Sequence, residues 1–330
     1  MLEAAQPCPW HLADWQQRIG HEQQPHAWLF SGPAGIGKRR YANALAASLL
    51  CSQPVPGPAC GQCRHCRLAL AGTHPDWLLL EPEEPGKMIK VDAVRQLVDF
   101  MAQTAQQGGR KVIVLHPAEA MNNNAANALL KSLEEPTADT YLLLVSDQPS
   151  QLLATIRSRC QQVNLPLPAA EAALAWLQQA QPDLDEATAQ QLLVMAAGAP
   201  LRALELHQQG AADWRSEVVA GVKQLLKGEQ GPTALAERWK AVPLLLLLDW
   251  FCDWTLDLLK YRQGAGELSS NADMDKVLGY MAVRLDMVAL HAWQDWLLAH
   301  RGMVLGKANL NRPLLLESLL LQWKQLIQRR

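Results

Sequence analysis

The residues that most clearly suggest a chemical role form a glycine-rich stretch, SGPAGIGKR, that ends at Arg39. It matches the phosphate-binding pattern G-x-x-x-x-G-K-[ST] through three residues, Gly32, Gly37 and Lys38, and carries a further glycine at Gly35. Backbone N–H groups of such a loop cradle phosphate oxygens, and the lysine reaches the outer phosphates. The match fails at Arg39, where a serine or threonine hydroxyl would hold Mg²⁺. The pattern predicts a phosphate loop that lacks one part of the hydrolytic chemistry; an ordinary glycine-rich turn is the alternative.

Four cysteines follow this loop within one short segment: Cys51, Cys60, Cys63 and Cys66. In a reducing compartment, cysteines at C-x2-C spacing are more typical of metal ligands than of disulfides. Four thiolates complete a tetrahedral Zn²⁺ shell and leave no open position, so we expect a structural zinc ion. His65 could replace one of the cysteines as a ligand. Buried thiols or a redox pair are the alternatives.

The acidic residues of a phosphate-loop ATPase are missing from their expected place. In such enzymes the strand that corresponds to residues 111–115 of this chain is followed by carboxylates. These carboxylates hold Mg²⁺ and polarise the attacking water. Here the apolar run 111–115 is followed by His116 and Pro117, and neither is acidic. Glu119 lies two residues further on and is expected on the side of a helix, which makes it a poor candidate base. The sequence therefore predicts no complete hydrolytic site in this chain.

The elements that position these residues alternate between strands and helices in the first half of the chain. We expect five buried strands at 27–30, 77–80, 111–115, 141–145 and 161–165. We expect helices between them at 41–50, 91–103, 124–133 and 151–156. This alternation predicts a mostly parallel sheet with helices on both faces.

Only helical patterns remain after residue 169, with segments at about 170–180, 186–197 and 200–208. Together with the length of 330 residues, this predicts more than one domain. We expect an α/β phosphate-loop domain at 1–167 with the cysteine module at 51–66, a small helical lid at 168–209 and an all-helical domain at 210–330.

Charge and hydropathy argue against a generally basic DNA-binding protein and against a membrane-spanning or secreted one. The net charge is −2, so the chain has no global basic field, and any DNA contact must come from a local patch or a partner. The longest apolar run, Val242 to Leu248, is too short to cross a bilayer, and residues 1–26 lack the apolar core of a secretory signal. We expect a soluble, cytosolic protein without membrane contact.

Several of these motifs occur in one order in a known family. They are HAWLFSGPAGIGK at 26–38, the four-cysteine insertion, GTHPDW at 72–77, NALLKSLEEP at 127–136 and SRC at 158–160. Together they resemble bacterial clamp-loader subunits of the AAA+ class, over most of residues 9–206. The resemblance implies an AAA+ fold for the first domain and a collar role for the C-terminal helices.

Within that family, Arg39, His116 and Pro117 make the chain similar to the delta-prime branch, which has lost the hydrolytic residues and kept SRC. The resemblance implies a subunit of the DNA polymerase III holoenzyme, a nucleotidyltransferase complex, with no complete active site of its own. Its implied partners are the gamma/tau and delta subunits and, through the assembled loader, the sliding clamp and primer–template DNA. Because Gly37 and Lys38 are retained, ATP binding is compatible with the loop, whereas hydrolysis is not expected.

The resemblance also implies roles for two arginines. Arg159 of SRC would act in trans as an arginine finger that stabilises charge on the γ-phosphate in a neighbouring gamma/tau site. A plain salt bridge is the alternative for this residue. Arg202 falls where AAA+ subunits place a nucleotide-sensing arginine on the lid.

Two rival functions make different demands on the sequence. A gamma/tau-like ATPase that is active on its own would need acidic residues at 116 and 117. A zinc-dependent module that touches DNA directly would need a basic surface beside the cysteines, where only Arg64, His65 and Arg67 supply charge.

Overall fold

The computed structural model describes residues 6–20, 24–53, 58–84, 86–107, 109–306 and 308–327. The chain divides into two compact units. The first consists of Met1–Asp183 and Gly198–Ala203, and the second of Leu184–Ala197 and Leu204–Arg330. The boundaries at 167 and 209 stay a prediction.

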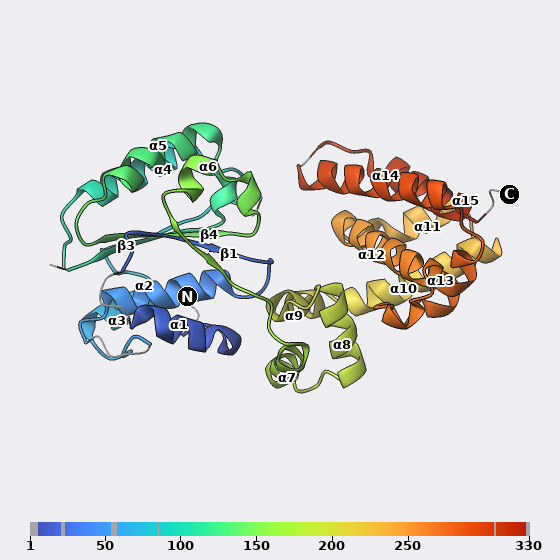
Figure 1. Cartoon of the computed structure of the whole chain (residues 1–330), viewed down its shortest axis with the longest axis horizontal. Helices are drawn as coiled ribbons and strands as arrows, with labels where there is room; N and C mark the ends of the chain where they lie inside the picture. The colour runs from blue at the N-terminus through green and yellow to red at the C-terminus, as the bar shows by residue number, and fades with distance from the viewer. Residues whose placement is uncertain are drawn as a thin grey trace. The chain divides into compact units, whose positions relative to one another are not determined.

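The first unit is built on a five-stranded sheet in the order β2-β3-β4-β1-β5 (Figure 1). Every neighbouring pair is parallel. The strands are β1 (Ala27–Ser31), β2 (Trp77–Leu80), β3 (Lys111–Leu115), β4 (Thr140–Ser146) and β5 (Gln161–Asn164). The predicted parallel α/β sheet is therefore confirmed.

Helices cover both faces of this sheet, as Figure 1 shows. The helices of the first unit are α1 (Leu12–Ile19), α2 (Lys38–Leu50), α3 (Arg64–Leu70), α4 (Val91–Ala102), α5 (Asn123–Glu134), α6 (Ala154–Arg157) and α7 (Ala170–Ala180), of which α7 lies away from the sheet. Successive side chains of a strand point to opposite faces. Leu29 of β1 thus belongs to the core that includes α4 and α5, and its neighbour Phe30 belongs to the core that includes α1 and α2. The phosphate-loop helix α2 and the helix α5 consequently lie on opposite faces.

The helix predicted at 151–156 is wrong in its first half. The chain instead forms a 3₁₀ turn at Pro149–Gln151 and the single helical turn α6. Between them the backbone of Leu152 is extended, with φ −75° and ψ 144°, and its side chain is buried. Burial of this leucine in the α5 side of the core therefore overrides the local helical pattern.

The second unit is entirely helical in its described residues. It contains α8 (Glu186–Met195), α10 (Ala211–Lys227), α11 (Pro232–Arg238), α12 (Leu244–Arg262), α13 (Asp275–Ala282), α14 (Met287–Leu305) and α15 (Arg312–Gln325). The helix α9 (Pro200–Gln208) contributes residues to both units. Four tryptophans form the centre of the core with no exposed surface: Trp239, Trp250, Trp254 and Trp323.

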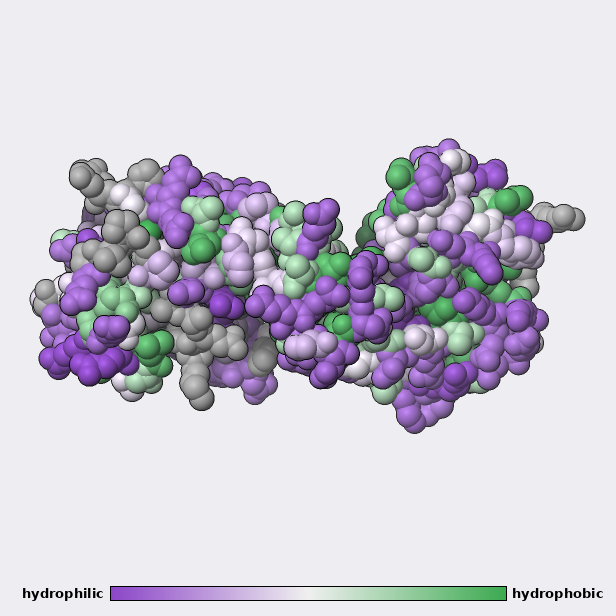
Figure 2. Space-filling model, turned by 90° about the horizontal axis from the view of Figure 1, so that it is seen from below, coloured by the Kyte–Doolittle hydropathy of each residue, from purple (hydrophilic) through white to green (hydrophobic). Residues whose placement is uncertain are grey.

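Hydrophilic side chains predominate on the face shown in Figure 2, and hydrophobic ones occur there in small groups. Most of the exposed large apolar side chains in the described ranges belong to the second unit. Val283 and Val288 are the extreme cases, with 75% and 76% of their surface accessible. None of the helices in the described ranges is both long enough and apolar enough to cross a membrane.

Candidate functional site

The phosphate loop connects β1 to α2 and has the backbone shape that its glycines predict. Gly32, Gly35 and Gly37 have φ angles of 143°, 77° and 94°. Side chains other than hydrogen are disfavoured at these angles, so glycine is required at all three positions. Gly37 is the N-cap residue of α2, and Lys38 is its first helical residue.

Close packing of the loop against its own chain excludes larger residues as well. A Cβ atom on Gly32 would lie 2.3 Å from the carbonyl oxygen of Leu165. A Cβ atom on Gly37 would lie 2.5 Å from Sγ of Cys8, in the segment that precedes α1. These glycines therefore have structural roles in the chain even without a bound nucleotide.

The lid segment lies directly on the same loop. The backbone N–H of Leu201 donates to the carbonyl oxygen of Gly35 at 3.0 Å. A Cβ atom on Gly35 would lie 2.5 Å from Cβ of Arg202. Arg202, the predicted sensor, is thus positioned beside the phosphate loop by backbone contact.

The lysine of the motif is buried and bonded inside the chain. The Lys38 side chain is only 3% exposed. Its ammonium donates to the carbonyl oxygen of Gly32 at 2.7 Å and to that of Pro33. It also forms an ion pair with Oδ1 of Asp147, the residue that follows β4, at 2.6 Å. The ammonium is thus held by two hydrogen bonds and one ion pair within the chain.

The position that should hold Mg²⁺ carries an ion pair. Arg39 Nη2 lies 3.0 Å from Oε2 of Glu81, which follows β2, and both side chains are partly exposed. Mg²⁺ binds oxygen ligands, and a guanidinium offers none. In this arrangement Arg39 supplies a cation where the motif places a metal ligand.

His116 and Glu119 do not restore an acid–base site. Burial lowers the pKa of His116, and its Nδ1 atom is buried with no hydrogen-bond partner among the described residues. Glu119 lies in a 3₁₀ turn and accepts the backbone N–H groups of Asp147 and Gln148 at 2.9 and 3.1 Å. The carboxylate therefore anchors the loop after β4.

The SRC motif lies between α6 and β5, away from the phosphate loop in the sequence. Ser158 Oγ donates to the carbonyl oxygen of Thr155 at 3.1 Å and closes the turn of α6. Cys160 is buried in the core with α5, where burial raises the pKa of its thiol to about 12. Between these two anchors, the Arg159 side chain remains 34% exposed.

Arg159 has two contacts within the chain. Its Nη1 donates to the carbonyl oxygen of Thr155 at 2.9 Å, and its Nη2 lies 2.6 Å from Oε1 of Glu134. Glu134 is the last residue of α5 and belongs to the NALLKSLEEP motif. The structure thus brings together two motifs that the sequence analysis treated separately.

The four cysteines converge at one point, as their spacing predicts. Their Sγ atoms all lie within 4.8 Å of one another. The distances are 3.9 Å from Cys51 to Cys63 and 3.8 Å from Cys60 to Cys66. Tetrahedral coordination with Zn–S bonds of about 2.3 Å requires sulfur atoms about 3.8 Å apart. The cluster can therefore hold a metal ion such as zinc.

Hydrogen bonds around the sulfur atoms favour thiolates. The backbone N–H of Cys63 lies 3.4 Å from Sγ of Cys60, and that of Cys66 lies 3.4 Å from Sγ of Cys63. Such outer-shell donors stabilise sulfur ligands of a metal. Cys51 ends α2, and Cys63 and Cys66 lie at the start of α3, so the module is attached to the helix that begins at the phosphate loop.

The histidine of the GTHPDW motif, His74, contacts His65 between two of the cysteines and the backbone of Asp76 before β2. His74 Nδ1 accepts the backbone N–H of Asp76 at 3.1 Å, and His74 Nε2 lies 3.0 Å from Nδ1 of His65. The buried carboxylate of Asp76 accepts the backbone N–H groups of Gln106 and Gln107 at 2.7 and 2.9 Å. These contacts hold the turn that joins α3 to β2 and attach to it the segment between α4 and β3.

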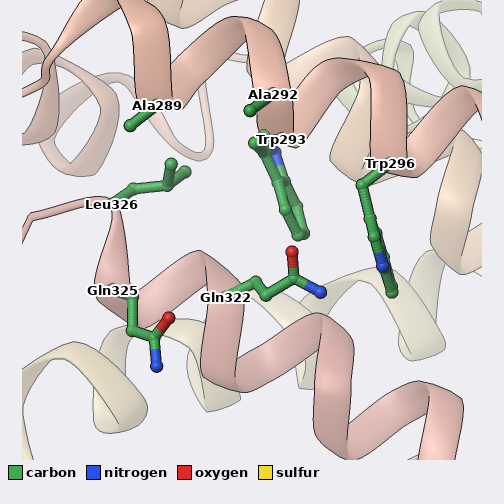
Figure 3. Close-up of a pocket in the computed structure, with 7 residues that line it drawn as sticks. All are labelled: Ala289, Ala292, Trp293, Trp296, Gln322, Gln325 and Leu326. Atoms are coloured by element: carbon green, nitrogen blue, oxygen red, sulfur yellow. The ribbon is translucent and has the colours of Figure 1, made fainter.

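A small pocket of about 160 Å³ lies in the second unit between α14 and α15. Figure 3 shows the rings of Trp293 and Trp296 projecting from α14 toward the side of α15 that carries Gln322. The two rings are stacked with centroids 5.4 Å apart. The lining has no acid, base or metal ligand, so the pocket has no chemistry of its own.

Three partners of the site residues were missed by sequence reasoning. Asp147 and Glu81 come directly after strands, and the carboxyl ends of parallel strands meet at one edge of a sheet. That rule could have identified both. Glu134 had no comparable signal, because its pairing with Arg159 depends on how α5 packs against α6.

Comparisons with known proteins agree with one another. A family model described as DNA polymerase III, delta subunit, matches residues 9–169, and the model for the C terminus of that subunit matches 209–325. DNA polymerase III subunit delta' of Pseudomonas aeruginosa is 56% identical over 319 residues, 96% of this chain and 97% of that protein.

More distant similarities extend to other subunits. DNA polymerase III subunit tau of Salmonella typhimurium is 37% identical over 140 residues, 42% of this chain and 21% of that protein. Among solved structures, a gamma subunit-related protein of Thermotoga maritima is 21% identical, with 96% of this chain and 99% of that chain covered and a TM-score of 0.43.

Proposed function

Because the chain belongs to the family of DNA polymerase III delta-prime subunits, we propose that it is a clamp-loader subunit that does not hydrolyse ATP itself. In this proposal it helps to load the sliding clamp onto primed DNA during replication. Its catalytic contribution is Arg159, which acts in trans on ATP bound by a neighbouring subunit.

The bonding of Lys38 is the observation that carries this proposal. The lysine would have to reach the outer phosphates of ATP, yet its ammonium is hydrogen-bonded to two loop carbonyls and paired with Asp147. To bind a triphosphate, the lysine would need to exchange these partners inside a buried site. Breaking buried charged hydrogen bonds is unfavourable, so the loop favours its internal arrangement.

The surroundings of Lys38 support the absence of hydrolysis. Arg39 stands in place of the hydroxyl that holds Mg²⁺, and His116 and Pro117 stand where carboxylates would follow β3. Glu119 uses one carboxylate oxygen to anchor the loop after β4. Even with a nucleotide in the loop, these residues would neither hold the metal nor activate water.

The finger role of Arg159 is supported by its exposure and its remaining donors. A guanidinium has five N–H donors. Among the described residues, Arg159 contacts Thr155 and Glu134 through one nitrogen each. Its remaining N–H groups could bind the oxygens of a phosphate, which a guanidinium binds in a bidentate manner.

We further propose that the partners are gamma/tau and delta subunits and that the second unit contributes the surface that contacts them. The exposed apolar side chains of α13, α14 and α15 support this assignment, since such side chains mark surfaces that other proteins cover. The Trp293–Trp296 pocket lies among these helices.

Zinc is the metal we propose for the cysteine cluster, in a structural role. Four sulfur donors at tetrahedral spacing suit Zn²⁺ and leave no position for a substrate. Once bound, the ion would join the end of α2 to the start of α3. The basic residues near the cluster are Arg64, His65 and Arg67 in the sequence and Arg110, which lines the same pocket as Cys51 and His65. These few residues are a small charge for a DNA-binding surface.

ATP turnover tests the proposal, measured on the isolated chain and on a loader reconstituted with gamma/tau and delta. We expect no turnover by the isolated chain, and turnover by the loader that falls with Arg159→Ala. Turnover by the isolated chain that Lys38→Ala abolishes would instead identify an independent ATPase of the gamma/tau type.

A further inference from the structure

We propose that Glu134 is a positioning residue for Arg159, holding its guanidinium in the orientation that a neighbouring subunit's ATP requires. The inference rests on the proposed finger role of Arg159. It goes further because it assigns a purpose to the acidic end of the NALLKSLEEP motif.

The placement of Glu134 is fixed by the ends of α5. Asn122 caps the start of the helix by accepting the backbone N–H of Ala125 at 2.8 Å. Pro136 disfavours continuation of the helix, which ends at Glu134. The carboxylate therefore projects from a helix end whose register is set at both termini.

The placement of Arg159 is fixed by the same core. Ile156 and Cys160, on either side of the arginine, are buried together with Leu129 and Leu133 of α5. The backbone that carries Arg159 is thus held against the helix that carries Glu134. Only the long side chain of the arginine has freedom to move.

Two contacts at different atoms restrict that freedom. Nη1 bonds to the carbonyl oxygen of Thr155, and Nη2 bonds to the carboxylate of Glu134. Because a guanidinium is planar, partners at both terminal nitrogens define its plane. Without Glu134, the Thr155 contact would leave the group free to turn about that single bond.

A finger that is already oriented loses less entropy when it meets the γ-phosphate. The Glu134 side chain is 50% exposed, and contacts of this exposure are weak. We therefore expect its loss to reduce the population of oriented arginine by about threefold to fivefold.

The test uses the full loader, assembled from this chain with gamma/tau and delta, and measures steady-state ATP hydrolysis with clamp and primed DNA. The relevant quantity is the share of kcat that Arg159→Ala removes. Glu134→Ala should lower this share about threefold to fivefold with little change in KM for ATP. Glu134→Gln should retain most of it, because the amide oxygen still accepts from Nη2.

Two further variants separate positioning from a general effect. Glu135→Ala removes the adjacent exposed acid, which makes no ion pair among the described residues, and should match the unmodified loader. Glu134→Ala combined with Arg159→Ala should be no slower than Arg159→Ala alone. A normal rate for Glu134→Ala, or a double variant slowed by the full extra factor, would overturn the proposal.

A second measurement distinguishes this proposal from the finger role itself. NMR of the arginine guanidinium groups in the isolated chain should show hindered rotation for Arg159, which Glu134→Ala releases. Free rotation in the unmodified chain, with loader turnover still sensitive to Arg159→Ala, would overturn only the positioning role. Turnover insensitive to Arg159→Ala would overturn the finger and its positioning together.

Discussion

The phosphate loop and the SRC turn lie on opposite sides of the same sheet and treat their cations in opposite ways. Lys38 is 3% exposed, and its ammonium has two hydrogen bonds and an ion pair within the chain. Arg159 is 34% exposed and has one hydrogen bond and one ion pair among the described residues. A cation bonded on every side stabilises its own fold, whereas a partly bonded, exposed cation can act on another molecule.

This contrast explains how a chain can keep the shape of a nucleotide site without its chemistry. The glycines of the loop are required by φ angles and by contacts with Leu165, Arg202 and Cys8. The motif can thus persist for packing reasons alone. In the proposed function the catalytic group is instead Arg159. Its backbone lies in a turn that the buried Cys160 anchors, and its side chain is partly exposed.

The largest effect should come from removing the displayed cation. Arg159→Ala should slow ATP hydrolysis at the neighbouring subunit's site by about 10³-fold or more, because the finger stabilises charge that develops in the transition state. Single-turnover hydrolysis by the reconstituted loader measures this. Arg157→Ala, two residues away, is the matched control and should be close to normal. Equal losses from both variants would point to damage of the turn rather than to a finger.

Removing the metal should have the next largest effect. It should destabilise the region of α2 and α3 and leave the region of α5 and α6 unchanged. Cys60→Ser with Cys63→Ser should release the bound metal and destabilise the module by about 3 kcal/mol or more, since metal binding stabilises the fold that forms the site. Metal analysis and hydrogen exchange over α2 and α3 report this. Exchange in α5 and α6 should stay unchanged, and a metal content that survives the double substitution would contradict the four-cysteine site.

A smaller loss of stability should follow removal of the buried cation. Lys38→Met keeps most of the side-chain volume but leaves the carboxylate of Asp147 and two carbonyls without their donor. We expect a decrease of about 1–3 kcal/mol in the free energy of unfolding, measured with urea. The exposed Lys131 changed to Met is the control. If Lys38→Met left the stability unchanged, its internal bonds would not hold the loop in solution.

The smallest effect should be on the pH dependence of the free energy of unfolding, through His116, which follows β3. Burial lowers the pKa of His116 in the folded chain, so the unfolded chain binds a proton first as the pH falls below 6.5. Above about pH 6.5, His116 therefore adds no pH dependence to the free energy of unfolding. Below that pH, it lowers the free energy of unfolding. His116→Gln should flatten the decline in the free energy of unfolding between pH 7 and pH 5 relative to the unmodified chain. Parallel curves for the variant and the unmodified chain would exclude this role.

Much of the fold could be predicted from the sequence because its signals are local. Apolar runs such as KVIVL define buried strands, and the helical pattern after the glycine-rich loop predicted α2, although the helix begins at Lys38 and not at residue 41. The cysteine cluster was predictable for the same reason, since its four ligands lie within one short segment. The failure at 151–156 arose where burial of Leu152 outweighed a local helical pattern.

The partners of the charged residues were less predictable, because each pairing depends on distant parts of the chain meeting. The rule on strand ends could have identified Asp147 and Glu81, but nothing in the sequence indicated Glu134. Lys38 meets Asp147 only through the pairing of β1 with β4. Arg159 meets Glu134 only through the packing of α5 with α6. The sequence predicted roles for both cations, and the structure shows that Lys38 is buried while Arg159 is partly exposed.

ATP turnover should be compared between two reconstituted loaders, one containing Lys38→Met and the other Arg159→Ala. We expect the Lys38→Met loader to hydrolyse ATP like the unmodified one and the Arg159→Ala loader to lose the activity of one site. Loss of turnover with an intact Lys38→Met loader, together with normal turnover with Arg159→Ala, would contradict these roles.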